Sequence, residues 1–121
     1  MPTFWDLDEV ERAVLDVASE EGLPWEVCAT WRPDPASRTQ EDIERTRATA
    51  GSLVERGWVW MYRIAPGNPD LTRDEVLAVL EHPHAWNYTP TWSHDVAVYL
   101  KPDGERIYFG TTSSDPPPSP E

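Results

Sequence analysis

Apolar residues at helical spacing predict three helices in the first half of the chain. The first helix is expected to begin after Asp6, an N-cap whose capping box Glu9 completes. Trp5 and Val10 are spaced for a hydrophobic staple around that cap, and Gly22 should end the helix in a left-handed conformation. The stripe expected to be buried comprises Leu7, Val10, Val14 and Val17.

The next two helices are separated by a turn that contains two prolines. A second helix is predicted over Trp25–Trp31, with Pro24 opening its first turn. Two prolines close together then prevent the helix from continuing. A third helix is predicted from about Thr39 to Arg56, and Gly57 should end it. Its apolar stripe comprises Ile43, Ala50, Leu53 and Val54.

Aromatic and β-branched residues then predict a strand, which is followed by a fourth helix. Residues 58–64, WVWMYRI, are typical of a strand that is covered on both faces. Thr72 is the expected N-cap of the fourth helix, with Glu75 completing a capping box and His82 near its end. The inner face of this helix should comprise Val76, Leu77 and Leu80.

A β-hairpin is predicted at the C-terminal end of the domain. Residues 95–101 and 105–109 are each typical of a strand, and Pro102-Asp-Gly104 connects them. Asp-Gly between two such runs favours a tight hairpin. A single domain is therefore expected over residues 1–111, followed by a flexible Pro-rich tail over residues 112–121.

The predicted order of three helices, a strand and a hairpin resembles a winged-helix domain. Residues 52–63, SLVERGWVWMYR, and residues 98–108, VYLKPDGERIY, carry this resemblance. Shorter motifs resemble small uncharacterised actinobacterial proteins of winged-helix type: Trp25-Glu-Val27, Glu55-Arg-Gly57, and a helix that ends before Pro83 and Trp86. The resemblance implies a winged-helix-like α+β fold, with the fourth helix and an aromatic loop inserted between strand and hairpin.

The chain is strongly acidic, with 22 acidic residues, 10 basic residues and a formal net charge of −12. Such a surface lacks the positive potential that attracts nucleic acids and anionic membranes. It suits a basic protein partner, and solubility alone is the simpler explanation. No apolar run approaches the roughly 20 residues that span a bilayer. With no signal peptide and a single cysteine, Cys28, a cytoplasmic protein is expected.

The candidate partner-binding surface combines the acidic first helix with the aromatic loop. Carboxylates attract basic side chains, or imitate the charge of nucleic acid, and exposed tryptophans anchor interfaces. The candidate residues are Glu9, Asp16, Glu20, Trp86, Tyr88 and Trp92. They favour a small non-catalytic adaptor, inhibitor or immunity-type protein. The alternatives are that the acids form solvated faces and that the aromatic residues pack in the core.

A second hypothesis is a DNA-binding transcriptional regulator, acting as a dimer through the third helix and the hairpin. Its candidate residues are Arg38, Arg45, Arg47, Arg56, Lys101 and Arg106. Glu41 and Glu44 on the same helix would face the phosphates, so we prefer the protein partner.

The histidine loop, residues 82–95, is a third candidate site, for a metal ion. Its possible zinc ligands are His82, His84, His94 and Asp95. Their spacing matches no established metal motif, so histidines at the surface of a packed aromatic loop are the preferred interpretation, and no cofactor is expected. Cys28 is expected to be a buried side chain rather than a nucleophile. Without a nucleotide-binding or triad motif, no enzymatic activity is expected.

Overall fold

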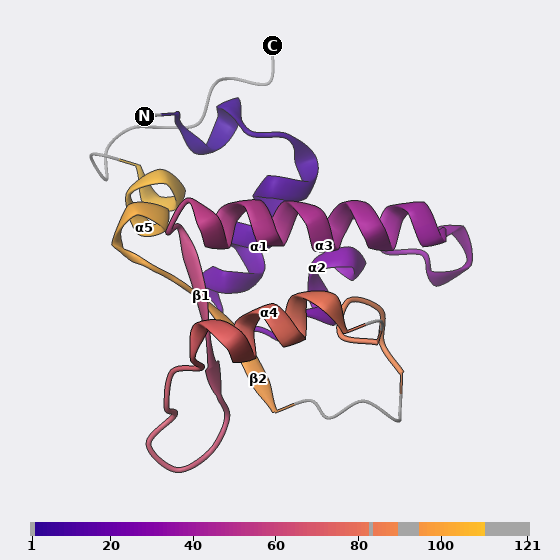
Figure 1. Ribbon diagram of the computed structural model, residues 1–121. Helices are drawn as coiled ribbons and strands as arrows, with labels where there is room; N and C mark the ends of the chain where they lie inside the picture. Colours follow the sequence, from indigo (N-terminus) through magenta and orange to yellow (C-terminus); the bar gives the residue numbers. More distant parts are fainter. Residues whose placement is uncertain (1, 83, 90–94, 111–121) are drawn as a thin grey trace.

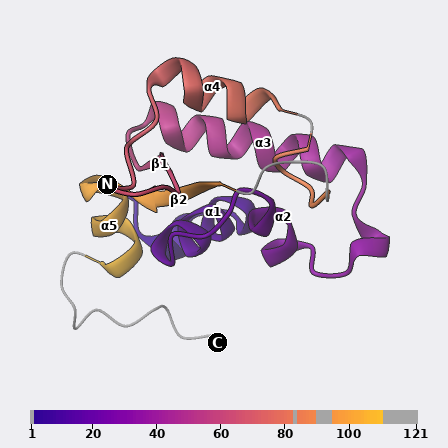
Figure 2. The same cartoon turned by 90° about the horizontal axis from the view of Figure 1, so that it is seen from below.

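A two-stranded antiparallel sheet lies between two pairs of helices in the computed structural model, which describes residues 2–82, 84–89 and 95–110. Figure 2 shows α3 and α4 on one side of the sheet and α1 and α2 on the other. The described elements are, in chain order, η1 (Phe4–Asp6), α1 (Glu9–Ser19), α2 (Trp25–Trp31), η2 (Pro35–Ser37), α3 (Gln40–Glu55), β1 (Val59–Arg63), α4 (Arg73–Glu81), β2 (Val96–Leu100) and α5 (Pro102–Phe109). The mixed α/β class is confirmed.

Strands β1 and β2 run antiparallel, in a register from Val59 opposite Leu100 to Arg63 opposite Val96. Val96, Ala97 and Val98 are all buried, so β2 is covered on both faces. The Val98 amide also donates to the Gly22 carbonyl at 2.9 Å and joins β2 to the turn after α1. Side chains from the helices and both strands fill the core, among them Val10, Val14, Leu15, Val27, Leu53, Val59, Met61, Val76 and Val98.

The predicted second, third and fourth helices are confirmed, because local signals fix their ends. Thr39 caps α3, where its hydroxyl accepts the Asp42 amide at 3.1 Å. Thr72 and Glu75 form the predicted capping box of α4, with the Thr72 amide donating to Glu75 at 2.8 Å. Gly57 follows α3 with a φ of 76°, a conformation that glycine adopts without steric cost.

Helix α1 begins two residues later than predicted. Its N-cap is Asp8, whose carboxylate accepts the amides of Val10 at 2.9 Å and Glu11 at 2.8 Å. Asp6 instead accepts the Thr3 amide at 3.0 Å and closes η1. Asp6 with Glu9 and Asp8 with Glu11 both fit a capping box, and the second of these starts the helix. The predicted stripe of Leu7, Val10, Val14 and Val17 is buried.

Two smaller predictions about individual residues are wrong. The left-handed residue after α1 is Glu21, with a φ of 54°, rather than Gly22. Gly22 is needed for close packing, since a Cβ there would lie 2.9 Å from Cγ1 of Val17. Leu77 is 37% exposed and does not face the core, which α4 contacts through Val76 and Leu80.

The predicted C-terminal β-hairpin is wrong, because residues 102–109 form helix α5. Pro102 fits the first helical position, and acidic Asp103 and Glu105 in the first turn suit the helix dipole. β2 pairs with β1 instead of with the residues that follow it. Gly104, expected in the hairpin turn, lies inside α5 against the Trp58 carbonyl. The predicted tail, residues 112–121, lies outside the described residues.

Candidate functional site

A groove of about 300 Å³ lies between η1, α1 and α2. Glu9, Ala13 and Asp16 share a face of α1, because residues three, four and seven positions apart lie along one side of a helix. Trp5 projects from η1 and is 48% exposed. The lining residues are Phe4, Trp5, Glu9, Arg12, Ala13, Asp16, Thr30 and Trp31. Figure 1 shows the N-terminal segment that carries η1 close to α5.

Four aromatic rings continue the groove toward α5. Phe4 packs edge-on against Trp5, with ring centroids 5.1 Å apart, and against Tyr108 at 5.2 Å. Tyr108 packs in turn against Phe109 at 5.0 Å. Phe109 is 60% exposed. This aromatic cluster (Phe4, Trp5, Tyr108 and Phe109) is not evident from the sequence, in which Trp5 fits a staple and Phe109 fits a strand.

The three candidate carboxylates of α1 have different surroundings. Glu9 and Asp16 line the groove. Glu9 lies 3.7 Å from the Arg45 guanidinium, and Asp16 accepts the Tyr108 hydroxyl at 2.7 Å. Glu20 is exposed, and among the residues that the structure describes neither it nor Asp16 forms an ion pair. The acidic part of the predicted surface therefore remains largely open to a partner at Asp16 and Glu20.

The negative charge around Asp16 affects the pKa of Tyr108. A hydrogen bond with Ser19 lowers the pKa of the phenol. The Asp16 hydrogen bond, burial and the charges of Asp16 and Glu20 together outweigh that effect and raise the pKa. Tyr108 is therefore a neutral donor that fixes one oxygen of Asp16.

Tyr99 is a second such tyrosine, and its titration gives a test of the fold. Burial and the hydrogen bond to Asp70 at 2.9 Å raise its pKa from 10.0 to about 12. A raised phenol pKa stabilises the folded protein fully below pH 10, and this stabilisation is lost as the pH rises toward 12. We expect wild type to lose about 1 kcal/mol more stability over this interval than Tyr99→Phe, after allowance for solvent screening. Urea unfolding at several pH values measures this, and parallel pH profiles would contradict it.

The arginines proposed for DNA are already engaged within the chain. Arg45 of α3 lies 3.9 Å from Asp8, the N-cap of α1, and Arg56, the C-cap of α3, lies 3.7 Å from Glu11 of α1. These acids partly neutralise both arginines. Arg47 forms an ion pair with Glu44 on its own helix.

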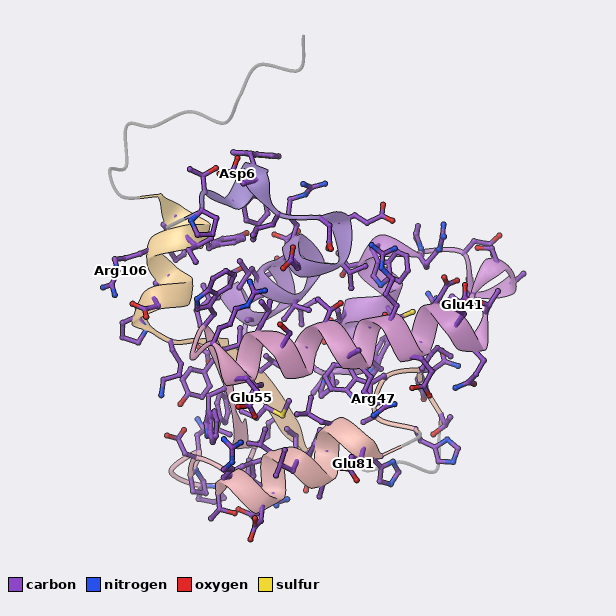
Figure 3. All side chains as sticks on the ribbon, turned by 45° about the horizontal axis from the view of Figure 1, so that its top comes forward. Asp6, Glu41, Arg47, Glu55, Glu81 and Arg106 are labelled. Carbon is purple, nitrogen blue, oxygen red and sulfur yellow. The ribbon has the colours of Figure 1, made fainter. Side chains whose placement is uncertain are left out.

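The three remaining DNA candidates are engaged elsewhere. Arg38 donates to the backbone carbonyls of Arg32 and Pro33, at 2.7 Å and 3.2 Å. Arg106 pairs with Asp103, and the Lys101 ammonium lies 5.6 Å from the ring of Trp60. Figure 3 shows Arg47 on α3 and Arg106 on α5 at well-separated places. The six residues therefore do not form one continuous positive surface.

The aromatic loop is divided between core and surface. Trp86 is only 1% exposed, and its indole N–H donates to the Val79 carbonyl at 3.2 Å, so its assignment as a partner anchor is wrong. Tyr88 is 49% exposed and packs edge-on against Trp25 at 5.3 Å. Trp92 lies outside the described residues.

The proposed metal ligands do not form a cluster in the described part of the chain. There, no group of three or more His, Cys, Asp or Glu side chains could hold an ion. The Nδ1 atom of His82 accepts the His84 amide at 3.1 Å, which gives one histidine a structural role. His94 lies outside the described residues.

Cys28 is fully buried, as predicted. Burial raises the pKa of its thiol, and a hydrogen bond with Thr46 opposes this effect. A thiol with a raised pKa is a poor nucleophile at neutral pH, which fits a packing role.

The fold and groove define a small acidic α+β domain with an aromatic, carboxylate-lined groove. Comparisons with protein-family models, curated proteins and solved structures found no match. Over the described residues, every helix is too short or too polar to cross a membrane.

Proposed function

We propose that this chain is a small acidic, non-catalytic protein that binds a basic protein partner, as an adaptor, inhibitor or immunity-type protein. The observation that carries the proposal is the groove beside α1, where the exposed ring of Trp5 and the half-buried ring of Phe4 lie next to the carboxylates of Glu9 and Asp16. Tryptophan, tyrosine and arginine are enriched among the few residues that carry most of the binding energy in interfaces, and charge complementarity selects the partner. In this proposal, η1 and α5 join α1 to form the interface, in place of the aromatic loop that the sequence predicts.

The charge balance supports a basic partner. The chain has a net charge of −12, and its cations are used internally, as in the pairs Arg56–Glu11, Arg63–Asp95 and Arg73–Glu55. The surface therefore presents carboxylates more readily than free guanidinium groups. A cytoplasmic location is part of the proposal, because the single cysteine is a buried thiol.

A DNA-binding regulator of winged-helix type is the second candidate. Three N-terminal helices leading into an antiparallel strand pair support it, together with the half-exposed arginines Arg45 on α3 and Arg56 directly after it. We rank it second because these arginines are paired with acids and α5 replaces the wing.

Binding of three labelled probes separates the candidates. A short arginine-rich peptide should bind, with an affinity that falls as salt is raised, because the attraction is electrostatic. Its citrulline counterpart should bind at least about tenfold more weakly, since it lacks the charge. Duplex DNA should not bind at physiological salt. Fluorescence anisotropy measures all three, and binding of DNA without binding of the arginine peptide would favour the regulator.

A further inference from the structure

We propose that the groove between η1, α1 and α2 holds one arginine or lysine side chain of the partner, with its charged end between the ring of Trp5 and the carboxylate of Asp16. This inference rests on the proposed function and specifies the contact. It follows from the contacts that other tryptophans of this chain make with arginine and lysine side chains.

Three tryptophans already receive a cation from within the chain. The guanidinium groups of Arg32 and Arg45 lie 4.9 Å and 5.2 Å from the ring of Trp31. Arg56 lies 5.0 Å from Trp58, and Lys101 covers Trp60. None of the cations in the described residues is placed over Trp5, although this ring is half exposed and lies beside carboxylates. Trp5 is thus an aromatic face ready for a cation from outside.

The charges in the groove favour its Asp16 end. Glu9 is partly neutralised by Arg45, and the Arg12 guanidinium is turned toward α1's N-terminal side, where it donates to the Leu7 carbonyl. Asp16 keeps one carboxylate oxygen beyond the one that accepts the Tyr108 hydroxyl. A cation at this end gains a charge-assisted hydrogen bond without displacing an internal ion pair.

The dimensions fit one side chain. A volume of about 300 Å³ is at the lower limit of ligand pockets, and aromatic walls suit the apolar stem of a long cationic side chain. Thr30 donates its hydroxyl to the Glu26 carbonyl, and its oxygen can still accept a hydrogen bond from the ligand.

The occupant should come from a different protein. A second copy of the chain would bring another net charge of −12. The residues after α5 contain Asp115 and Glu121 but no lysine or arginine, so they cannot supply the cation. A basic segment of a partner protein is the occupant that the charges favour.

Substitutions that change affinity in opposite directions test the contact, with the arginine-rich peptide as the probe. Asp16→Asn should weaken binding about threefold, and Trp5→Ala about tenfold, because they remove the charge partner and the aromatic face. Arg12→Gln should strengthen binding about twofold, since it removes the like charge in the groove. A variant that failed to fold could not produce this gain.

Glu81→Gln is the matched control. It removes the same unit of charge from α4, which Figure 3 shows at the opposite end of the molecule from Asp6 and η1. We expect it to leave the affinity nearly unchanged. If Glu81→Gln and Asp16→Asn weaken binding equally, the peptide is attracted by the net charge of the protein alone, and the groove inference is wrong. If wild type does not bind the peptide, the proposed function itself is wrong.

Discussion

Gly104→Ala should destabilise the protein by about 3 kcal/mol, although alanine is normally the better residue inside a helix. A Cβ at this position would lie 2.0 Å from the carbonyl oxygen of Trp58 and 2.9 Å from its carbonyl carbon. Both atoms belong to the backbone, which cannot rotate away as a side chain would. The same oxygen accepts the Lys101 amide at 2.9 Å, so moving it would also disturb the junction between β2 and α5. Urea unfolding at equilibrium measures the loss.

Gly51→Ala provides the control for this experiment. Gly51 lies inside α3, where an added Cβ would meet only Cδ1 of Leu80, at an ordinary 3.9 Å. This substitution should stabilise the protein by up to about 1 kcal/mol, through helix propensity alone. If Gly104→Ala were as stable as wild type while Gly51→Ala behaved as expected, the close contact between α5 and Trp58 would be contradicted.

The sequence predicts the elements whose ends depend on neighbouring residues. Thr39 and Thr72 begin α3 and α4 because each meets its capping partner three residues later. Gly57 ends α3 for an equally local reason. Such signals act within one turn of the chain, so they can be identified without knowing what the helix packs against.

The C-terminal region shows where local signals fail. Pro102-Asp-Gly104 is compatible both with a hairpin turn and with the first turn of a helix. The choice depends on the partner of β2, which is β1, and on the space beside Trp58. Both are tertiary facts that the residues around Pro102 do not contain.

The candidate site was half predicted for the same reason. Glu9 and Asp16 were identified from their charge, and they do line one groove. The sequence position of Trp5 fits a staple. In the structure its ring lines the groove with α1 and α2 and packs against Phe4, which in turn contacts Tyr108 of α5. Glu9 and Asp16 are seven residues apart on α1, and this spacing is the signal in the sequence that they share a face.

Trp86→Ala should cost about 4 kcal/mol of stability, close to the whole stability of many small domains. The indole is 1% exposed, and its N–H is bonded to the last turns of α4 through the Val79 carbonyl. Removing it leaves a cavity beneath the loop and breaks one of the two hydrogen bonds to the Val79 carbonyl, which still accepts the His82 amide. Thermal or urea unfolding measures the effect.

Tyr88→Ala in the same loop separates packing from partner binding. Tyr88 is half exposed, so its loss should cost only about 1 kcal/mol or less. Neither substitution should change the affinity of the folded protein for the arginine-rich peptide, because Trp86 and Tyr88 do not line the groove. If Trp86→Ala kept its stability but lost peptide binding, the aromatic loop would be the interface after all, and the groove beside Trp5 would lose its role.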